Sequence, residues 1–167
     1  RRQRQMCIET ALACPVPRVL RPGGVTPDQL RAVLGEVEID KAVFKALESG
    51  EKVLSPGMKY KHYSPNAHVI IVKGDFDKFA SLVAEPRSER TCAVCFDGEE
   101  DKISVPAYPY GHADSPEEQA RELFDVLRHV DDEKMELAFV RFPSLDGVGM
   151  AVYNRLLRAA GFEVIEL

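Results

Sequence analysis

Residues 68–73 read His-Val-Ile-Ile-Val-Lys, a run of four consecutive apolar side chains between two polar ones. Because both faces of such a strand would be apolar, the run predicts a strand in a sheet that is covered on both sides. Residues 75–84 then repeat apolar side chains with a helical period, and residues 91–96, Thr-Cys-Ala-Val-Cys-Phe, form a second apolar run. A strand, a helix and a strand in this order indicate a parallel βαβ unit.

The rest of the chain continues this alternation. Ser115-Pro116-Glu117-Glu118 has the pattern of a capping box, with Ser as N-cap and Pro in the first turn of a long helix. The periodicity further predicts strands over 103–108, 136–142 and 162–165 and a last helix over 147–160. We therefore expect an α/β fold, a Rossmann-like three-layer sandwich with a mainly parallel sheet of about five strands.

An arm of helical and extended segments precedes this body. Thr26-Pro27-Asp28-Gln29 predicts the start of a helix that presents Leu30, Val33 and Leu34 on one side. Residues 41–48 predict a second short helix. Residues 1–14 carry no clear pattern, and we expect them to be poorly ordered.

The most unusual stretch of the arm is 55–65, Ser-Pro-Gly-Met-Lys-Tyr-Lys-His-Tyr-Ser-Pro. Two prolines and a glycine disfavour a regular helix there. Between the prolines, cations alternate with aromatic rings, at Lys59, Tyr60, Lys61, His62 and Tyr63. This pattern suits contact with an anion that has a flat part, such as a nucleotide or RNA. An ordinary solvated linker explains the same composition, and this alternative stays open.

Charge is distributed unevenly along the chain. Of 22 Lys and Arg residues, 11 lie in residues 1–67, with only 7 of the 27 Asp and Glu residues. An acidic body therefore follows a basic arm, and an acidic body disfavours broad binding of nucleic acid, because phosphates would be repelled.

Composition also bears on location. No window approaches the run of about 18 apolar residues that crosses a bilayer, so no membrane partner is expected. We see no secretory signal and expect a cytoplasmic protein. The chain begins with Arg rather than Met, which indicates a trimmed or partial protein.

Four cysteines raise the question of a metal site. Cys92 and Cys95 form a C-x-x-C pair, but they lie in an apolar run that predicts a strand. Residues three apart on a strand point to opposite faces and cannot bind one ion. We therefore expect no metal site, and free thiols in a reducing compartment.

Candidate ligand sites in the body lie at the carboxyl ends of the strands. Gly147 and Gly149 open the last helix, whose free N–H groups suit an anion. Close packing explains the same glycines. Asn154 and Arg155 lie in the middle of that helix, where Arg155 has a plain structural reading as the partner of a carboxylate. His112 lies in a loop, and the sequence identifies no partner for it.

The known catalytic motifs are missing from this sequence. There is no glycine-rich phosphate loop, nucleophile elbow or zinc-protease motif. From the residues alone, the body therefore has no recognisable catalytic set.

Three segments in the same order resemble long-form threonylcarbamoyl-AMP synthases, which join a YrdC-like catalytic domain to a C-terminal α/β domain. They are 18–35 (RVLRPGGVTPDQLRAVLG), the stretch 55–65 and 147–161 (GVGMAVYNRLLRAAG). The resemblance runs from about residue 15 to the end. It implies a division into 1–25 (a remnant of the upstream catalytic domain or a disordered tail), 26–67 (the linker) and 68–167 (the C-terminal domain).

The resemblance also implies an activity for the whole enzyme. Such a nucleotidyltransferase joins threonine, bicarbonate and ATP, with Mg²⁺, into threonylcarbamoyl-AMP and pyrophosphate, for the threonylcarbamoyladenosine modification of tRNA. The enzyme would then serve tRNA only indirectly. The family's Lys-x-Arg and Ser-x-Asn set is not present here in that setting, so we expect this chain to need the upstream domain and to have neither catalytic residues nor a cofactor of its own.

Two further residue roles follow from the resemblance. It implies that residues 59–63 act as a lid over the catalytic cleft and that Arg21 matches an arginine that contacts the nucleotide. Two alternatives from other classes stay open. One is a free-standing regulatory module that binds a nucleotide or another anion, and the other is an accessory domain that contacts RNA through residues 52–63.

Overall fold

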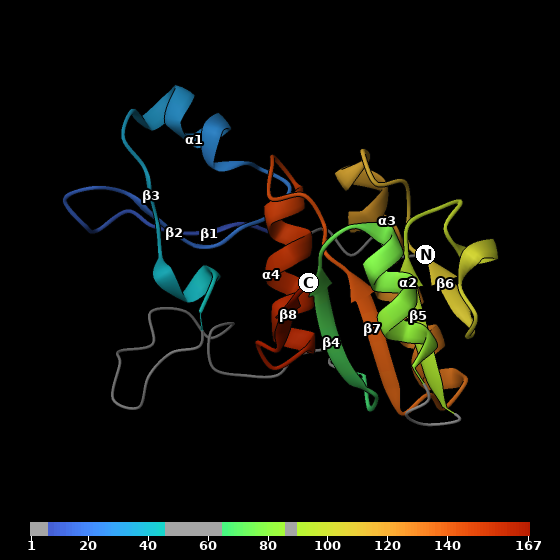
Figure 1. The fold of residues 1–167 in the computed structure, drawn as a ribbon. Coiled ribbons are helices and arrows are strands. Elements are labelled where there is room, and N and C mark those ends of the chain that lie inside the picture. Colours follow the sequence, from blue (N-terminus) through green and yellow to red (C-terminus); the bar gives the residue numbers. More distant parts are fainter. Residues whose placement is uncertain (1–6, 46–64, 86–89) are drawn as a thin grey trace.

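The structure is a computed structural model that describes residues 7–45, 65–85 and 90–167. Within these residues the strands form two sheets, one of five strands and one of three. Figure 1 shows the helix α4 (Gly149–Ala159) between the two sheets, with the arm on one side and the larger sheet on the other. The arm and the body are thus arranged around one helix.

The five-stranded sheet is entirely parallel, which confirms the predicted α/β fold. Its strands follow the order β6-β5-β7-β4-β8, and every neighbouring pair is parallel. Their bounds are β4 (His68–Lys73), β5 (Thr91–Cys95), β6 (Ala107–Pro109), β7 (Leu137–Arg141) and β8 (Val164–Glu166). In the central register Ile70 pairs with Phe139, which in turn pairs with Ala93 on the other neighbouring strand.

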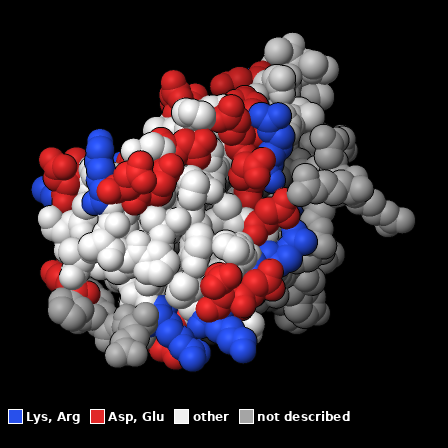
Figure 2. All heavy atoms as spheres, turned by 90° about the vertical axis from the view of Figure 1, so that its right-hand side faces the viewer, with Lys and Arg blue, Asp and Glu red and all other residues white. Residues whose placement is uncertain are grey.

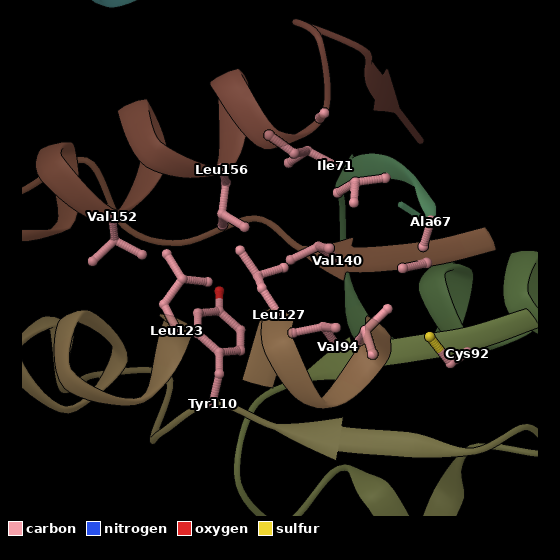
Figure 3. Packing of buried hydrophobic residues seen from close by; sticks show 14 of the residues in the cluster. Ala67, Ile71, Cys92, Val94, Tyr110, Leu123, Leu127, Val140, Val152 and Leu156 are labelled. Carbon is pink, nitrogen blue, oxygen red and sulfur yellow. The ribbon is translucent and has the colours of Figure 1, made fainter. Parts of the chain in front are cut away.

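Helices cover both faces of this sheet, as the apolar strands require. On one face, α2 (Phe76–Ala84) packs Phe79 and Val83 against Phe139 and its neighbours. On the other face lie α3 (Pro116–Asp132) and α4, and Figure 3 shows their side chains meeting those of the strands. The core residues labelled there include Leu123 and Leu127 from α3 and Val152 and Leu156 from α4. Burial of each such side chain contributes about 1.5–3 kcal/mol.

Two helix starts that the sequence predicts have different outcomes. At α1 (Pro27–Leu34), Gln29 N donates to Thr26 Oγ1 at 3.2 Å and Thr26 N donates to Gln29 Oε1 at 2.9 Å, so the capping box forms. At α3 the predicted box is wrong, because Ser115 makes no side-chain cap bond. Glu118, the intended partner, instead contacts His112. His112, six residues before Glu118 in the sequence, therefore takes the place of Ser115 as its partner.

The predicted third strand is also displaced. Instead of 103–108, the strand β6 comprises Ala107–Pro109 and follows a 3₁₀ turn, Glu100–Lys102. Ile103 and Val105 pack against the α2 side of the core without joining the sheet. Their apolar alternation thus reflects packing alone. Pro106 precedes β6 and Pro109 ends it, which suits an edge strand.

The arm contains a small sheet that the sequence analysis did not predict. It consists of β1 (Glu9–Ala11), β2 (Arg18–Arg21) and β3 (Glu38–Ile39), with β1 antiparallel and β3 parallel to β2. The expectation of poor order is therefore wrong for the residues of β1. They are held by pairing with β2, whose Val19 is fully buried.

The second predicted helix of the arm is shorter than expected over its described part. A 3₁₀ turn, Lys41–Val43, replaces the start of the predicted helix 41–48. Its remaining residues, from 46 on, lie outside the described residues. Among the described residues, the helices are all too short or too polar to cross a membrane.

Acidic side chains outnumber basic ones on the face that lies nearest β6 in Figure 1. Figure 2 shows this face, with Asp and Glu side chains over much of its rim. The distribution agrees with the acidic composition of the body and with the expectation that this surface repels phosphates.

The two strand cysteines are buried thiols. Cys92 belongs to the core beneath α3 and α4, and Cys95 is equally inaccessible to solvent. Burial raises the pKa of each of them to about 12. A thiol with such a pKa is almost never ionised at neutral pH, which makes both groups poor nucleophiles.

We therefore predict that a thiol reagent at pH 8 modifies Cys92 and Cys95 at least about 100-fold more slowly than the exposed Cys7, because burial opposes both ionisation and access. The rates are measured by mass spectrometry of the labelled peptides. The same reaction in concentrated urea is the control, where the difference should vanish. Comparable rates in the native protein would contradict the buried placement of β5.

Candidate functional site

The carboxyl ends of β4 and β7 lie side by side, and the chain leaves them toward opposite faces of the sheet. After β4 it continues to α2, and after β7 it continues to α4. In open parallel sheets this kind of position is where ligands bind. Arg141, the last residue of β7, lies here. Its Nη1 donates to the carbonyl of Gly74 at 2.8 Å, and its Nε donates to Glu99 Oε2 at 3.2 Å.

Aromatic rings surround the guanidinium of Arg141. Its central carbon lies 5.9, 5.3 and 5.4 Å from the ring centroids of Phe76, Phe79 and Phe96, within cation–π range. The side chain is only 12% exposed, and that of Glu99 is 17% exposed. The protein's own residues thus occupy the crevice in which a Rossmann-like fold ordinarily holds its ligand.

The backbone around Arg141 is held as firmly as its side chain. The buried Tyr110 hydroxyl donates to the carbonyl of Arg141 at 2.8 Å, and burial raises the pKa of Tyr110 well above its usual value. Gly74 lies against Leu167. A Cβ added at Gly74 would be 3.1 Å from Leu167 Cβ. These contacts hold the carboxyl ends of β4 and β7 in place.

A second cluster joins the loops after β5 and β6 to the first turn of α3. His112 Nδ1 lies 2.8 Å from Glu118 Oε2 and 3.3 Å from Asp97 Oδ2. The hydrogen bond and the charge of Glu118, followed by the charge of Asp97, raise the pKa of His112. The bond from His112 lowers the pKa of Glu118. His112 therefore has two acidic partners that the sequence analysis did not identify.

Asp97 also fixes the loop that carries His112. Gly111 N donates to Asp97 Oδ1 at 3.0 Å, and Gly111 has a positive φ of 111°. A Cβ at this position would lie 2.9 Å from the backbone nitrogen of Gln119. One ring nitrogen and two carboxylates are donors that suit a divalent cation, but their mutual contacts are those of a hydrogen-bonded ion pair.

Backbone conformation and close packing explain the two glycines at the start of α4. Gly147 has a φ of 54°, in the left-handed region. A Cβ on Gly149 would lie 2.2 Å from the carbonyl oxygen of Ser144, so only glycine fits. Gly149 N donates to the carbonyl of Asp146 at 2.8 Å. The tight turn before α4 therefore uses both glycines.

Asn154 and Arg155 have separate surroundings on α4. Asn154 is 2% exposed, and its Nδ2 donates to the carbonyl of Val43 at 2.7 Å. The guanidinium of Arg155 lies 4.3 Å from the ring centroid of Phe124 on α3. Asn154 therefore connects α4 to the arm, and Arg155 connects α4 to α3.

The structure places Arg21 on β2 and engages its side chain within the arm. Its Nε and Nη2 donate to the carbonyl of Cys7 at 3.2 and 3.1 Å, and its Nη1 lies 2.9 Å from Glu9 Oε1. The linker candidates, residues 59–63, lie outside the described residues. Their predicted role therefore stays a prediction.

The arm also carries an open hollow of about 450 Å³. It is lined by Arg18, Arg31, Val37, Glu38, Ile39, Asp40 and Lys41. Arg18 pairs across it with Glu38 at 2.8 Å and with Asp40 at 3.7 Å. The basic and acidic side chains of the hollow thus neutralise one another in part.

Sequence reasoning missed the role of Arg141. The available signal was a charged residue at the carboxyl end of an apolar strand, in Glu-Leu-Ala-Phe-Val-Arg-Phe (136–142). A charge in that position must find partners, because the strand delivers it to the buried edge of the sheet. The sequence does not say whether those partners come from a ligand or from the protein.

The comparisons with known proteins agree on one family. A family model described as the C-terminal domain of threonylcarbamoyl-AMP synthase matches residues 25–161. The threonylcarbamoyl-AMP synthase of Bacillus subtilis is 37% identical over 164 residues, which cover 93% of this chain and 46% of the relative. The chain therefore spans about half the length of the curated relatives it matches.

Solved structures give the same picture. One is Sua5 from Pyrococcus abyssi with a neighbouring histidine and tyrosine replaced by alanine, at a TM-score of 0.81 and 32% identity, covering 96% of this chain and 46% of that one. Another is Sua5 from P. abyssi complexed with L-threonine, at a TM-score of 0.79 and 31% identity, covering 98% and 48%.

The ion pair of His112 yields a prediction. We expect His112 to titrate above its ordinary value of 6.5, because Glu118 and Asp97 stabilise the imidazolium. The contribution of the pair to folding is complete between the ordinary values of Glu118, 4.5, and of His112, 6.5. It is lost as pH rises through the raised pKa of His112 and as pH falls through the lowered pKa of Glu118.

NMR titration of the His112 ring measures this shift. Glu118→Gln should lower the midpoint more than Asp114→Asn, because Asp114 contributes least to the raised pKa. A midpoint at or below 6.5 in the unmodified protein, or the reverse order of the two variants, would contradict the arrangement.

Proposed function

This chain belongs to the threonylcarbamoyl-AMP synthase family through the C-terminal domain of that family, and on this basis we propose that it takes part in the synthesis of threonylcarbamoyl-AMP. The observation that carries the proposal is the match over nearly the whole chain to relatives of this name. The proposed reaction joins threonine, bicarbonate and ATP, with Mg²⁺, and releases pyrophosphate and water. The P. abyssi complex with L-threonine supports threonine as the amino acid.

We assign the chemistry to a YrdC-like catalytic domain and a supporting role to this chain. The arm supplies a surface for that partner. Leu12, Val25, Val33 and Leu34 are 66%, 44%, 82% and 43% exposed, although all four are apolar. Val33 and Leu34 belong to the apolar side of α1, which would be buried if the catalytic domain packs on it. Arg21 would then meet the nucleotide after exchanging its present partners.

The linker has a chemical reason to cover the catalytic cleft. Threonylcarbamoyl-AMP is a labile mixed anhydride, and the carbamate that precedes it is unstable in water, so a covering segment protects both. Lys59 and Lys61 would offset phosphate or carboxylate charge, and Tyr60 and Tyr63 would pack over the adenylate. A neighbouring histidine and tyrosine are replaced by alanine in one solved structure of P. abyssi Sua5, and this chain contains such a pair, His62-Tyr63.

The body itself favours this supporting role over the two alternatives. A regulatory module that binds nucleotides would use the crevice that Arg141 and Glu99 fill. An accessory domain that contacts RNA through residues 52–63 would carry an acidic body, one face of which Figure 2 shows, and such a body repels phosphates. Our proposal therefore leaves tRNA as an indirect partner, reached through the released adenylate. We place the reaction in the cytoplasm, as the sequence analysis expects.

The experiment that tests the proposal uses an intact synthase composed of this chain and its catalytic domain. We expect Tyr60→Ala and Lys59→Ala each to lower the release of pyrophosphate from ATP, threonine and bicarbonate by at least about fivefold, because the unstable carbamate is then lost before it reacts with ATP. Lys78→Ala on the exposed side of α2 is the matched control and should retain the original rate. Original rates in both linker variants would contradict the lid.

A companion assay tests the assignment of the chemistry. With the same substrates, the chain alone should release no pyrophosphate above background, because it lacks the family's catalytic set. Turnover by the chain alone would refute the supporting role.

A further inference from the structure

Asn154 makes a buried contact that has no part in the proposed lid or in the proposed docking surface. It lies on α4, whose Val152 and Leu156 face the five-stranded sheet. Its own amide points to the arm instead and donates to the carbonyl of Val43, which is 111 residues away in the sequence. Both residues are almost fully buried, at 2% and 0% exposure. A hydrogen bond made in such a place is costly to lose, because the carbonyl is then left without its donor.

The segment that receives this bond is held by hydrogen bonds of its own. Asp40 Oδ1 accepts from Ala42 N at 2.9 Å, and Val43 N donates to the carbonyl of Asp40 at 3.0 Å, which closes the 3₁₀ turn. Asp40 N donates to the carbonyl of Val19 at 2.9 Å, which ties the turn to β2. Asn154 therefore holds a defined turn and not a loose chain.

The chain is fixed again where it enters the body. Asn66 N donates to Asp131 Oδ1 at 2.6 Å, and His68 N donates to the carbonyl of Glu136 at 2.8 Å. The residues between Val43 and Asn66 include the motif at 59–63. The turn at Val43, before the linker, and the start of β4, after it, are thus both held by hydrogen bonds to the body.

We propose that Asn154 is a positioning residue for the synthase reaction, because it fixes the turn at Val43 from which the linker departs. This inference rests on the proposed function. A tethered group acts through its effective concentration and alignment at the place where it works, and both fall when one of its anchors is released. Asn154 touches no substrate and acts only through the turn.

The test measures the intact synthase with Asn154→Ala and with Asn154→Asp, which keeps the size of the side chain but removes its donor. Each should lower kcat/KM by about tenfold. Each should also lower the amount of threonylcarbamoyl-AMP recovered per pyrophosphate by at least about twofold, since exposed intermediates are hydrolysed. This ratio does not depend on the amount of folded enzyme, so a purely structural defect leaves it unchanged.

Tyr110→Phe is the matched control. It removes another buried side-chain donor from a backbone carbonyl, but within the body and away from the arm. It should lower Tm by a comparable amount while kcat/KM stays within about twofold of the original and the product ratio is unchanged. Asp40→Ala loosens the same turn from its other end, without altering α4, and should reproduce the effects of the Asn154 variants.

Hydrogen exchange gives a readout that is independent of activity. In Asn154→Ala, the amides of residues 43 and 44 should exchange faster than in the original protein or in Tyr110→Phe. Unchanged exchange, or an unchanged product ratio in an active synthase, would overturn the positioning role alone. An intact synthase without activity would overturn the proposed function and this role with it.

Discussion

A parallel sheet whose central strands are apolar on both faces is unstable unless both faces are covered. β4, β5 and β7 are such strands, and this requirement accounts for α2 on one face and for α3 and α4 on the other. The requirement also places the arm. Because α4 must lie on the sheet with one side, its other side is available to the arm, and Asn154 uses it.

The crevice at Arg141 shows how a common ligand position can become part of the protein's own support. The guanidinium joins the end of β7 to the carbonyl after β4 and to Glu99 after β5. One side chain therefore connects the carboxyl ends of three strands, which a ligand would otherwise connect. This use of the fold agrees with the supporting role that we propose for the chain.

Periodicity in the sequence was sufficient to predict the body, because His68–Lys73 and Thr91–Cys95 carry local patterns that long-range contacts reinforce. Thr26 and Gln29 likewise form the predicted capping box. Prediction failed where contacts outside the local pattern decide the structure. Glu118 leaves its cap for His112, the strand Glu9–Ala11 depends on pairing with β2, and the bond from Asn154 to Val43 has no local signature at all. The candidates at residues 59–63 stay predictions.

The proline that ends β6 has a consequence for behaviour at high concentration. Residue 109 has no N–H group, so the outer side of this strand offers an incomplete row of donors. At the opposite end of the sheet, β8 is only three residues long and ends in a glutamate. Strands of a second molecule therefore gain little by adding to either border, which protects the fold from growing into fibrous aggregates.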